Sequence, residues 1–391
     1  MRIGVDATCW ANIRGYGRFT REICAAMVEA GPQHEFVFFA DDAAARVFEL
    51  RASNVRLVTV EQSVAPTQAA SADSARSPRD MLRLTAAVRR EPLDVFFSPS
   101  VYTYFPLPPG QRAVVCIHDC IAERFPQLTL PSRRARLFWS AKVKLALWQA
   151  RRVLTVSEYS ARDLERVLHV KRERIDVAVE APAAAYAPVE SRARIEAAAR
   201  KFGLDPHAPW FTYVGGFNPH KHVDTIVRAL GAVSQGRAQR PQLALVGSID
   251  KDVFHGDQAR IRRTIAELGL ESQVVWTGFV ADDELRALHS GATALLLPSE
   301  CEGFGLPAVE AAACGAPVIA TLESPLPELL AGAGLFVKPG ERAELENAMR
   351  SLLDDAALRA RCSAAALAQV KLLSWPRAAR AALDSLERAA R

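Results

Sequence analysis

The chain has 391 residues, of which half are hydrophobic and 24% are charged, and its formal net charge is +5. That length exceeds one ordinary hydrophobic core, so we expect a globular protein of two domains. No run of eighteen apolar residues and no charged-then-apolar leader occurs, which predicts a cytoplasmic protein without a transmembrane helix. Seven cysteines without C-x-x-C pairs predict reduced, mostly buried thiols.

Short apolar segments alternate with longer amphipathic ones through the first half of the chain. The expected strands are Arg2–Asp6, Phe36–Phe39, Val55–Val60, Val95–Ser98, Ala113–Ile117 and Val153–Val156. This alternation predicts a parallel, doubly wound α/β sheet. Residues 62–78, rich in alanine and serine with two prolines, are expected to form a mobile loop.

A glycine-containing segment, Gly15-Tyr16-Gly17, follows the first expected strand and precedes a helix. The spacing is only a weak dinucleotide-binding signal, because a Rossmann fingerprint requires a third glycine near Thr20. Asp41, after the second strand, is at the position of the ribose-binding acid in that fingerprint. We interpret the segment as a ligand-facing loop at the end of a strand.

A histidine closes the fifth expected strand in the sequence Cys116-Ile117-His118-Asp119. At a strand end, His118 can hydrogen-bond a substrate hydroxyl, or it can be a satisfied structural histidine. Ser157, after the next strand, is expected to cap a helix rather than act as a nucleophile, because no G-x-S-x-G setting surrounds it.

Residues 133–152 carry seven basic side chains and no acidic one, interleaved with leucine, phenylalanine and tryptophan. The pattern predicts a basic amphipathic helix that contacts an anionic membrane, at the inner face of the plasma membrane. The alternative is an ordinary helix with its aromatic face in the core. Nucleic acid is a less favoured partner because no recognition motif accompanies the charge.

A proline-marked connection after about residue 180 separates a second series of strands from the first. These strands are expected at Trp210–Val214, Gln242–Val246, Val274–Thr277, Ala294–Leu297, Pro317–Ala320 and Gly334–Val337. We expect domains at residues 1–185 and 186–373, followed by an amphipathic helix at residues 374–391. Ligands of open α/β sheets bind beyond the carboxyl ends of the strands, so two facing sheets predict a cleft between them.

The second domain opens with a strand, the glycine turn Gly215-Gly216, and Lys221 just before a helix. A lysine at this place can neutralise a leaving diphosphate, which gains charge as its bond to the sugar breaks. Lys221 is therefore the candidate electrophilic stabiliser, although an isolated lysine at a helix start is usually a solvated one.

Two carboxylates, Glu302 and Glu310, flank the sequence Gly303-Phe304-Gly305-Leu306-Pro307 after the apolar run 294–297. The glycines allow close approach of a ligand, and Pro307 suits the first position of a helix. The free N–H groups of that helix favour a diphosphate or polarised sugar hydroxyls. One carboxylate can then face a sugar while the other accepts hydrogen bonds from a diol such as ribose.

An Asp-x-Asp sequence at residues 250–252 is a carboxylate pattern that can hold a divalent ion. A lysine stands at its centre, and the Glu302-x7-Glu310 motif supplies an alternative donor site. We therefore expect metal-independent chemistry without a cofactor, with Lys221 and helix amides providing the positive charge.

The motif from Glu302 to Glu310, followed by Glu-Ala-Ala-Ala-Cys-Gly-Ala-Pro-Val, resembles the signature of the retaining glycosyltransferases of family 4. The resemblance extends over nearly the whole chain. It implies a GT-B fold, in which two Rossmann-like domains face each other across a cleft and the final helix crosses back onto the first domain. It also implies a nucleoside-diphosphate sugar as donor, either GDP-linked or UDP-linked.

The resemblance assigns catalytic roles to Glu302, Lys221 and His118. Glu302 would stabilise or orient the sugar, Lys221 would stabilise the diphosphate, and His118 would touch the donor sugar. The implied donor-binding residues are Gly15, Tyr16, Gly17, Gly215, Gly216, Val280, Phe304, Gly305, Leu306 and Glu310. Many members have arginine where this chain has Gly216, so His220 or another basic residue is expected to compensate.

The expected reaction is therefore retaining transfer of a mannose-type or related hexose to a glycan or lipid-linked acceptor in bacterial polysaccharide or lipopolysaccharide assembly. Two alternatives use the same cleft. One is a GT-B phosphorylase or sugar-nucleotide epimerase, and the other is a non-catalytic nucleotide-sugar-binding protein.

Overall fold

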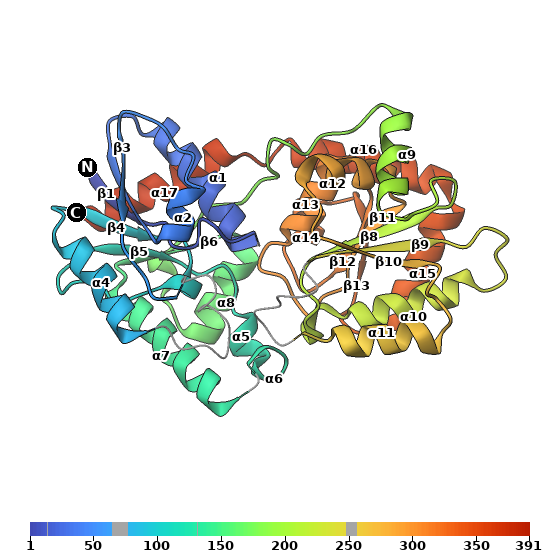
Figure 1. The fold of residues 1–391 in the computed structure, drawn as a ribbon, viewed down its shortest axis with the longest axis horizontal. Helices are drawn as coiled ribbons and strands as arrows, with labels where there is room; N and C mark the ends of the chain where they lie inside the picture. Colours follow the sequence, from blue (N-terminus) through green and yellow to red (C-terminus); the bar gives the residue numbers. More distant parts are fainter. Residues whose placement is uncertain (14, 65–76, 131, 248–255) are drawn as a thin grey trace. The chain divides into compact units, whose positions relative to one another are not determined.

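The computed structural model describes residues 1–13, 15–64, 77–130, 132–247 and 256–391 (Figure 1). Arg14, most of the predicted loop at residues 62–78 and the Asp-x-Asp sequence at 250–252 lie outside these ranges. The chain divides into two compact units, residues 1–180 with 374–391, and residues 181–373. Each unit has its own parallel sheet.

The first unit is built on a seven-stranded sheet with the order β3-β2-β1-β4-β5-β6-β7. Its strands are β1 (Arg2–Asp6), β2 (Glu35–Ala40), β3 (Val55–Thr59), β4 (Val95–Ser98), β5 (Ala113–Cys116), β6 (Arg152–Thr155) and β7 (Ile175–Val177). All neighbouring strands run parallel. The six expected strands are confirmed, and β7 was not predicted because its central Asp176 interrupts the apolar pattern.

Helices cover the sheet of the first unit on both faces (Figure 1). They are α1 (Gly15–Ala30), α2 (Asp42–Arg46), α4 (Pro78–Arg89), α5 (Ile121–Arg124), α6 (Pro126–Thr129), α7 (Arg133–Gln149), α8 (Glu158–Leu168) and α17 (Trp375–Ala390). Two short 3₁₀ turns, η1 (Val101–Thr103) and η2 (Arg172–Arg174), complete its described elements. The last helix, α17, is separated from the rest of the unit by the whole second unit in sequence, yet it packs directly against α1.

The second unit has a six-stranded sheet with the order β10-β9-β8-β11-β12-β13. Its strands are β8 (Trp210–Val214), β9 (Gln242–Val246), β10 (Val274–Gly278), β11 (Ala294–Leu297), β12 (Val318–Thr321) and β13 (Gly334–Val337). All pairs are parallel, as the sequence predicted. Its helices are α9 (Arg192–Lys201), η3 (Pro219–Lys221), α10 (Val223–Ser234), α11 (Gln258–Glu267), α12 (Asp282–Gly291), α13 (Leu306–Ala313), α14 (Leu326–Leu329), α15 (Arg342–Asp354) and α16 (Ala356–Val370).

The strand order of the second unit reverses between β8 and β11, which are neighbours in space although they are far apart in sequence. The loops that leave these two strands at their carboxyl ends therefore start side by side. Such a switch point is where open α/β sheets bind ligands. The loop after β8 contains Lys221, and the loop after β11 contains Glu302.

The cysteines agree with the prediction. All seven lie in the described ranges, where each is buried and free of a disulfide bond. In the same parts of the chain, no helix combines the length and the apolar content that crossing a bilayer requires.

The packing of α17 on the first unit can be tested at Leu386, which is fully buried. Leu386→Ala leaves a cavity, so we expect the free energy of unfolding to fall by about 2–5 kcal/mol. The matched control is Leu82→Ala, because the Leu82 side chain on α4 is exposed. This substitution should change the free energy of unfolding by no more than about 0.5 kcal/mol. Denaturant titration measures both, and equal effects would show that α17 contributes nothing to the core.

Candidate active site

An ion pair joins the two loops at the switch point of the second unit. Lys221 Nζ lies 2.8 Å from Glu302 Oε1, and both side chains are largely buried. Ser299 Oγ donates to the same carboxylate oxygen at 2.6 Å. Two residues predicted from separate motifs, 81 positions apart, are thus in direct contact.

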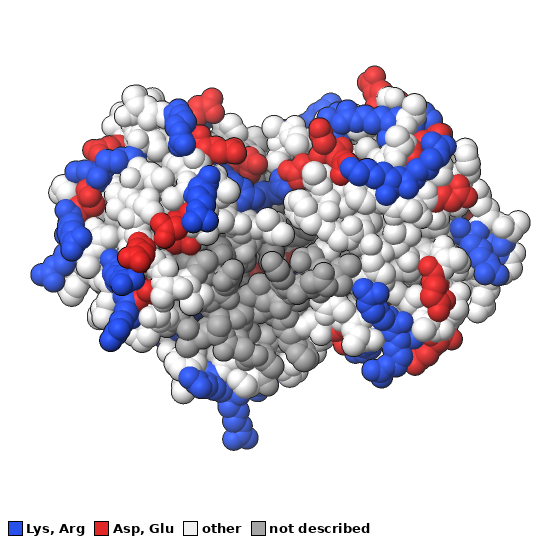
Figure 2. Space-filling view, viewed as in Figure 1, with Lys and Arg blue, Asp and Glu red and all other residues white. Residues whose placement is uncertain are grey.

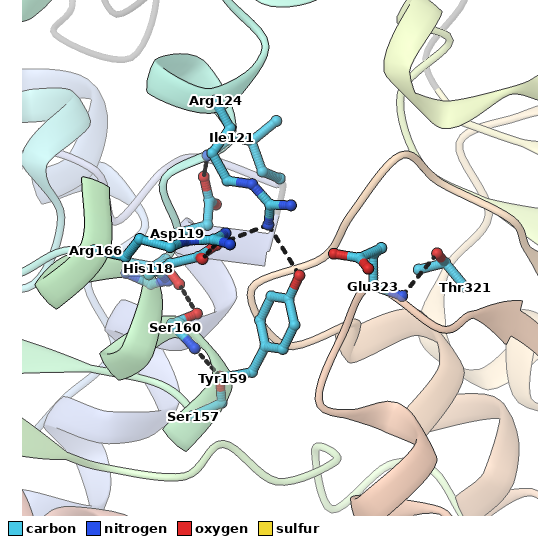
Figure 3. A network of polar contacts seen from close by, with 11 residues as sticks. His118, Asp119, Ile121, Arg124, Ser157, Tyr159, Ser160, Arg166, Thr321 and Glu323 are labelled. Carbon is cyan, nitrogen blue, oxygen red and sulfur yellow. Dashed lines mark hydrogen bonds and ion pairs between the residues drawn. The ribbon is translucent and has the colours of Figure 1, made fainter. Parts of the chain in front are cut away.

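The backbone reinforces this junction. The amide of Glu300 donates to the carbonyl of His220 at 2.7 Å, which ties the β11 loop to the β8 loop. The amide of Glu302 donates to the carbonyl of Glu323 at 3.0 Å, which adds the loop after β12. Figure 3 shows how that third loop is fixed in turn, because the Glu323 amide donates to Thr321 Oγ1 at 3.2 Å. Glu302 is therefore positioned by three loops at once.

Gly305 gives the β11 loop its sharp turn into α13. Its φ is +89°, and a Cβ built there would lie 2.7 Å from Leu326 Cδ1. The helix begins at Leu306, one position earlier than predicted, and Pro307 is its second residue. The side chains of Phe304, Leu306 and Glu310 are buried. The first amides of α13 have no intrahelical acceptor, as at any helix start.

Hydrogen bonds to the backbone fix the glycine turn after β8. The amide of Gly215 donates to the carbonyl of Val246 at 3.0 Å, and the Tyr213 hydroxyl donates to the carbonyl of Gly216. A side chain at Gly247 would collide with this turn, since its Cβ would be 2.2 Å from the Gly215 oxygen.

His220 is one of the basic residues expected to compensate for the arginine that many family members have at the position of Gly216. Burial, and then the positive neighbours Lys221 and His222, hold the pKa of the His220 imidazole well below its ordinary value. The lowered pKa favours the neutral ring, and Lys221 is the residue of this turn that pairs with Glu302. Compensation by His220 or another basic residue stays a prediction.

A second basic–acidic contact lies beside the first and was not predicted. His222 Nε2 is 2.8 Å from Glu300 Oε2. His222 also has a left-handed backbone, with φ +53°, a conformation that costs a non-glycine residue roughly 1 kcal/mol. The contact joins residues 78 positions apart, so no local sequence pattern indicates it.

Val280 lies two residues before α12 and has a buried side chain. It follows Gly278, whose φ is +69°, by two residues. Ala281 is the N-cap of α12, and Asp282 is its first helical residue. The Asp282 carboxylate accepts a hydrogen bond from the Tyr186 hydroxyl at 2.8 Å.

In the first unit, the loop after β1 is compact. Gly17 lies so close to the preceding loop that a Cβ there would be 2.1 Å from the Asn12 carbonyl oxygen. The Asn12 side-chain amide donates to the Tyr16 hydroxyl at 2.6 Å, and Arg21 Nη1 donates to the carbonyl of Asn12 at 2.8 Å. Gly15 is exposed, and a Cβ there would meet nothing within 4 Å. Asp41, at the position of the ribose-binding acid, caps α2 instead.

His118 is held by contacts to both ring nitrogens. Nε2 lies 2.9 Å from the Pro99 carbonyl and Nδ1 lies 3.6 Å from Glu180 Oε1, while the Phe19 ring packs edge-on at 4.6 Å. Burial lowers the pKa of His118, but the Cys116 sulfur and the Glu180 carboxylate outweigh it and raise that pKa well above its ordinary value. Both ring nitrogens thus have neighbours within the first unit, which fits the structural alternative of the sequence analysis as well.

A polar network surrounds the His118 segment (Figure 3). Arg124 Nη1 donates to the Tyr159 hydroxyl and to Asp163 Oδ2, both at 2.9 Å. Ser160 Oγ donates to the His118 carbonyl at 2.8 Å, and Ser157 caps α8 as predicted. Sequence reasoning missed Arg124 and its partners, because no periodic pattern connects α5 with α8.

No group of three or more histidine, cysteine, aspartate or glutamate side chains within the described ranges is placed to hold a metal ion.

Two parallel, doubly wound units with a site at a strand switch point define a two-domain Rossmann-like glycosyltransferase fold of the GT-B type. Sucrose-phosphate synthase from Thermosynechococcus elongatus has this fold, with a TM-score of 0.77 and 20% identity over 99% of this chain and 98% of its own. HepE from Anabaena, solved with UDP and glucose, has a TM-score of 0.72 and 18% identity over 99% of this chain and all of its own.

The family model of the glycosyl transferases group 1 matches residues 194–369. A Glycosyltransferase Family 4 model matches residues 13–178. The O-antigen chain mannosyltransferase B of Escherichia coli is 28% identical over 72% of this chain and 71% of its own length. Alignments with other relatives span about half of those proteins or less.

The turn at Gly305 yields a stability prediction. Gly305→Ala must both adopt a positive φ and displace Leu326, so we expect it to lower the free energy of unfolding by about 2–4 kcal/mol. Gly269→Ala separates the two effects, because Gly269 has φ +61° with nothing within 4 Å of its Cβ. That control should cost about 1 kcal/mol. Equal losses in the two variants would contradict the steric role of Leu326.

Proposed function

We propose that this glycosyltransferase transfers a hexose, with retention of configuration, from a GDP- or UDP-linked donor to a glycan or lipid-linked acceptor in bacterial polysaccharide assembly. The observation that carries the proposal is the Lys221–Glu302 pair, placed within one loop of the start of α13. The O-antigen relative supports a mannose-type sugar, and the UDP and glucose bound to HepE support a nucleotide-sugar donor.

Lys221 and the amides of α13 would act on the diphosphate. As the sugar–phosphate bond breaks, negative charge grows on the leaving group, and fixed positive charge is most effective where it meets that growth. A helix start offers unpaired N–H groups and a positive dipole end to the same anion. These groups suit metal-independent chemistry, which we propose for this chain.

The two glutamates would divide the donor between them. Glu302, fixed by Ser299 and Lys221, would stabilise positive charge at the sugar or orient it. Glu310, on the first turns of α13, would accept hydrogen bonds from the ribose hydroxyls. The turn at Gly215-Gly216 and the backbone at Phe304, Gly305 and Val280 would approach the nucleotide closely.

In the first unit, His118 would touch the donor sugar or steady the reacting centre, held in place by the Pro99 carbonyl and the Glu180 carboxylate. The loop from Gly15 to Gly17 would face the donor through its exposed end. These two assignments follow the family resemblance and the placement of both segments at the carboxyl ends of β1 and β5.

The division of roles can be tested with Glu302→Gln and Glu310→Gln. We expect Glu302→Gln and Lys221→Ala each to lower turnover at least ~100-fold with the fold intact, by loss of electrostatic stabilisation. Glu302→Gln should still be stabilised against heat by UDP or GDP in EDTA, whereas Glu310→Gln should lose that shift. Near-normal turnover in both Glu302→Gln and Lys221→Ala would overturn the proposed site, and a nucleotide shift that requires Mg²⁺ or Mn²⁺ would overturn metal independence.

We also propose that α7 contacts an anionic membrane, where lipid-linked acceptors reside. Three large apolar side chains on this helix face solvent, with exposed fractions of 70% for Leu137, 50% for Phe138 and 79% for Trp148. Leu137 and Trp148 are eleven residues apart, so they share one face of the helix. The alternative, an ordinary helix with its aromatic face in the core, holds for Trp139 but not for Phe138 and Trp148.

Basic side chains surround these apolar groups. Arg133, Arg134, Arg136 and Lys144 are exposed on the same helix, and no acidic residue occurs between 133 and 152. Figure 2 shows lysine and arginine side chains projecting over α7, at the lower edge of the first unit in that view. An apolar centre with a basic surround suits insertion into the headgroup region of an anionic bilayer.

Vesicle sedimentation tests this contact. The double variant Leu137→Ala/Trp148→Ala should bind phosphatidylglycerol vesicles at least about tenfold more weakly than the parent, because it loses the inserted apolar area. Phe279→Ala, which removes an exposed ring from the second unit, is the control and should bind normally. Parent binding that is absent, or equal on phosphatidylcholine vesicles, would contradict the proposal.

A further inference from the structure

Two tryptophans of α7 lie on different sides of the helix. Trp148 is exposed, whereas Trp139 is half-buried and points into the unit, where its ring contacts a neighbouring loop and a neighbouring helix. The outer face is the proposed membrane surface. The inner face, through Trp139, contacts groups next to both candidate site loops of the first unit.

The first contact leads to the loop after β1. The Trp139 ring lies 5.0 Å from the ring of Tyr102 in η1, and Tyr102 stacks on Tyr16 with ring centroids 5.2 Å apart at 21°. Lys142 strengthens this path, since its Nζ donates to the Tyr102 carbonyl at 3.0 Å and lies 5.4 Å from the Trp139 ring centroid. Two aromatic contacts, one tilted and one stacked, thus join α7 to Tyr16.

The second contact leads to the segment after β5. Trp139 Nε1 donates to Glu123 Oε1 at 2.7 Å, and Glu123 lies on α5, five residues after His118. Burial raises the pKa of the Glu123 carboxyl to about 7, and the indole N–H acts in the opposite direction by stabilising the ionised form. One side chain therefore holds α5 by a hydrogen bond and η1 by its ring.

Movement of α7 cannot be separated from these two segments. A helix drawn toward a bilayer by its outer face moves as a rigid body, because its backbone is hydrogen-bonded throughout. Packed aromatic contacts and a buried hydrogen bond transmit such a displacement, whereas exposed polar contacts exchange with water.

We infer that Trp139 is a positioning residue that transmits docking of α7 on an anionic surface to the Tyr16 loop and to the segment from His118 to Glu123. The inference rests on the proposed membrane contact and concerns the regulation of the same site. Docking orders both segments. The two loops of the first unit are therefore ordered at the membrane, where a lipid-linked acceptor is present.

Hydrogen-exchange mass spectrometry on the full chain, with and without phosphatidylglycerol vesicles, tests this inference without any turnover assay. In the parent, vesicles should slow exchange at least ~3-fold in peptides that cover residues 12–22 and 118–126. Trp139→Ala should bind the vesicles as the parent does but lose the slowing in both peptides. Trp139→Phe keeps a ring and loses the N–H, so it should keep the slowing at 12–22 and lose it at 118–126.

Trp148→Ala is the matched control on the outer face, and it should lose vesicle binding and slowing together. Slowing that persists in Trp139→Ala, or vesicle binding without slowing in the parent, would overturn the inference and leave the membrane contact standing. A parent that does not bind the vesicles would overturn both. Loss of turnover in the Glu302 variants is a separate readout, so failure of the proposed reaction is recognised independently.

Discussion

The ion pair between Lys221 and Glu302 is the interaction on which the loops of the second unit depend. A charge removed from water is stable only when it is paired and hydrogen-bonded. Here Ser299 supplies the additional hydrogen bond. An anion that arrives at this edge competes with Glu302 for the same ammonium group, so ligand binding and loop arrangement are linked through one side chain.

Parallel strands explain how residues so far apart in sequence reach one another. Every strand of a parallel sheet ends at the same edge, so the chain must return by a helix before it can add another loop there. In the second unit this brings the loops after β8, β11 and β12 into backbone contact around Glu302. In the first unit it gathers Tyr16, Tyr102 and His118, which follow β1, β4 and β5 respectively.

The strands and the principal site loops could be predicted because each has a local signal. Buried parallel strands are short apolar runs, and Gly305 before α13 marks a turn that only glycine tolerates well. Features fixed by distant partners could not be predicted. Arg124 is oriented by Tyr159 and Asp163 from another helix, and the lowered pKa of His220 follows from burial that no motif reports. In the three-residue strand β7, the central Asp176 pairs with Arg152 of the neighbouring strand β6, a contact that no motif reports.

The helix α17 has a consequence for how the chain is made. It completes the surface against α1, but residues 374–391 are synthesised only after the entire second unit. While the ribosome translates residues 181–373, the first unit has an uncovered apolar face, and such transiently exposed surface favours misassembly and chaperone capture. The second unit, whose residues are contiguous, can therefore finish folding first. Vectorial synthesis reverses the order in which the two units mature.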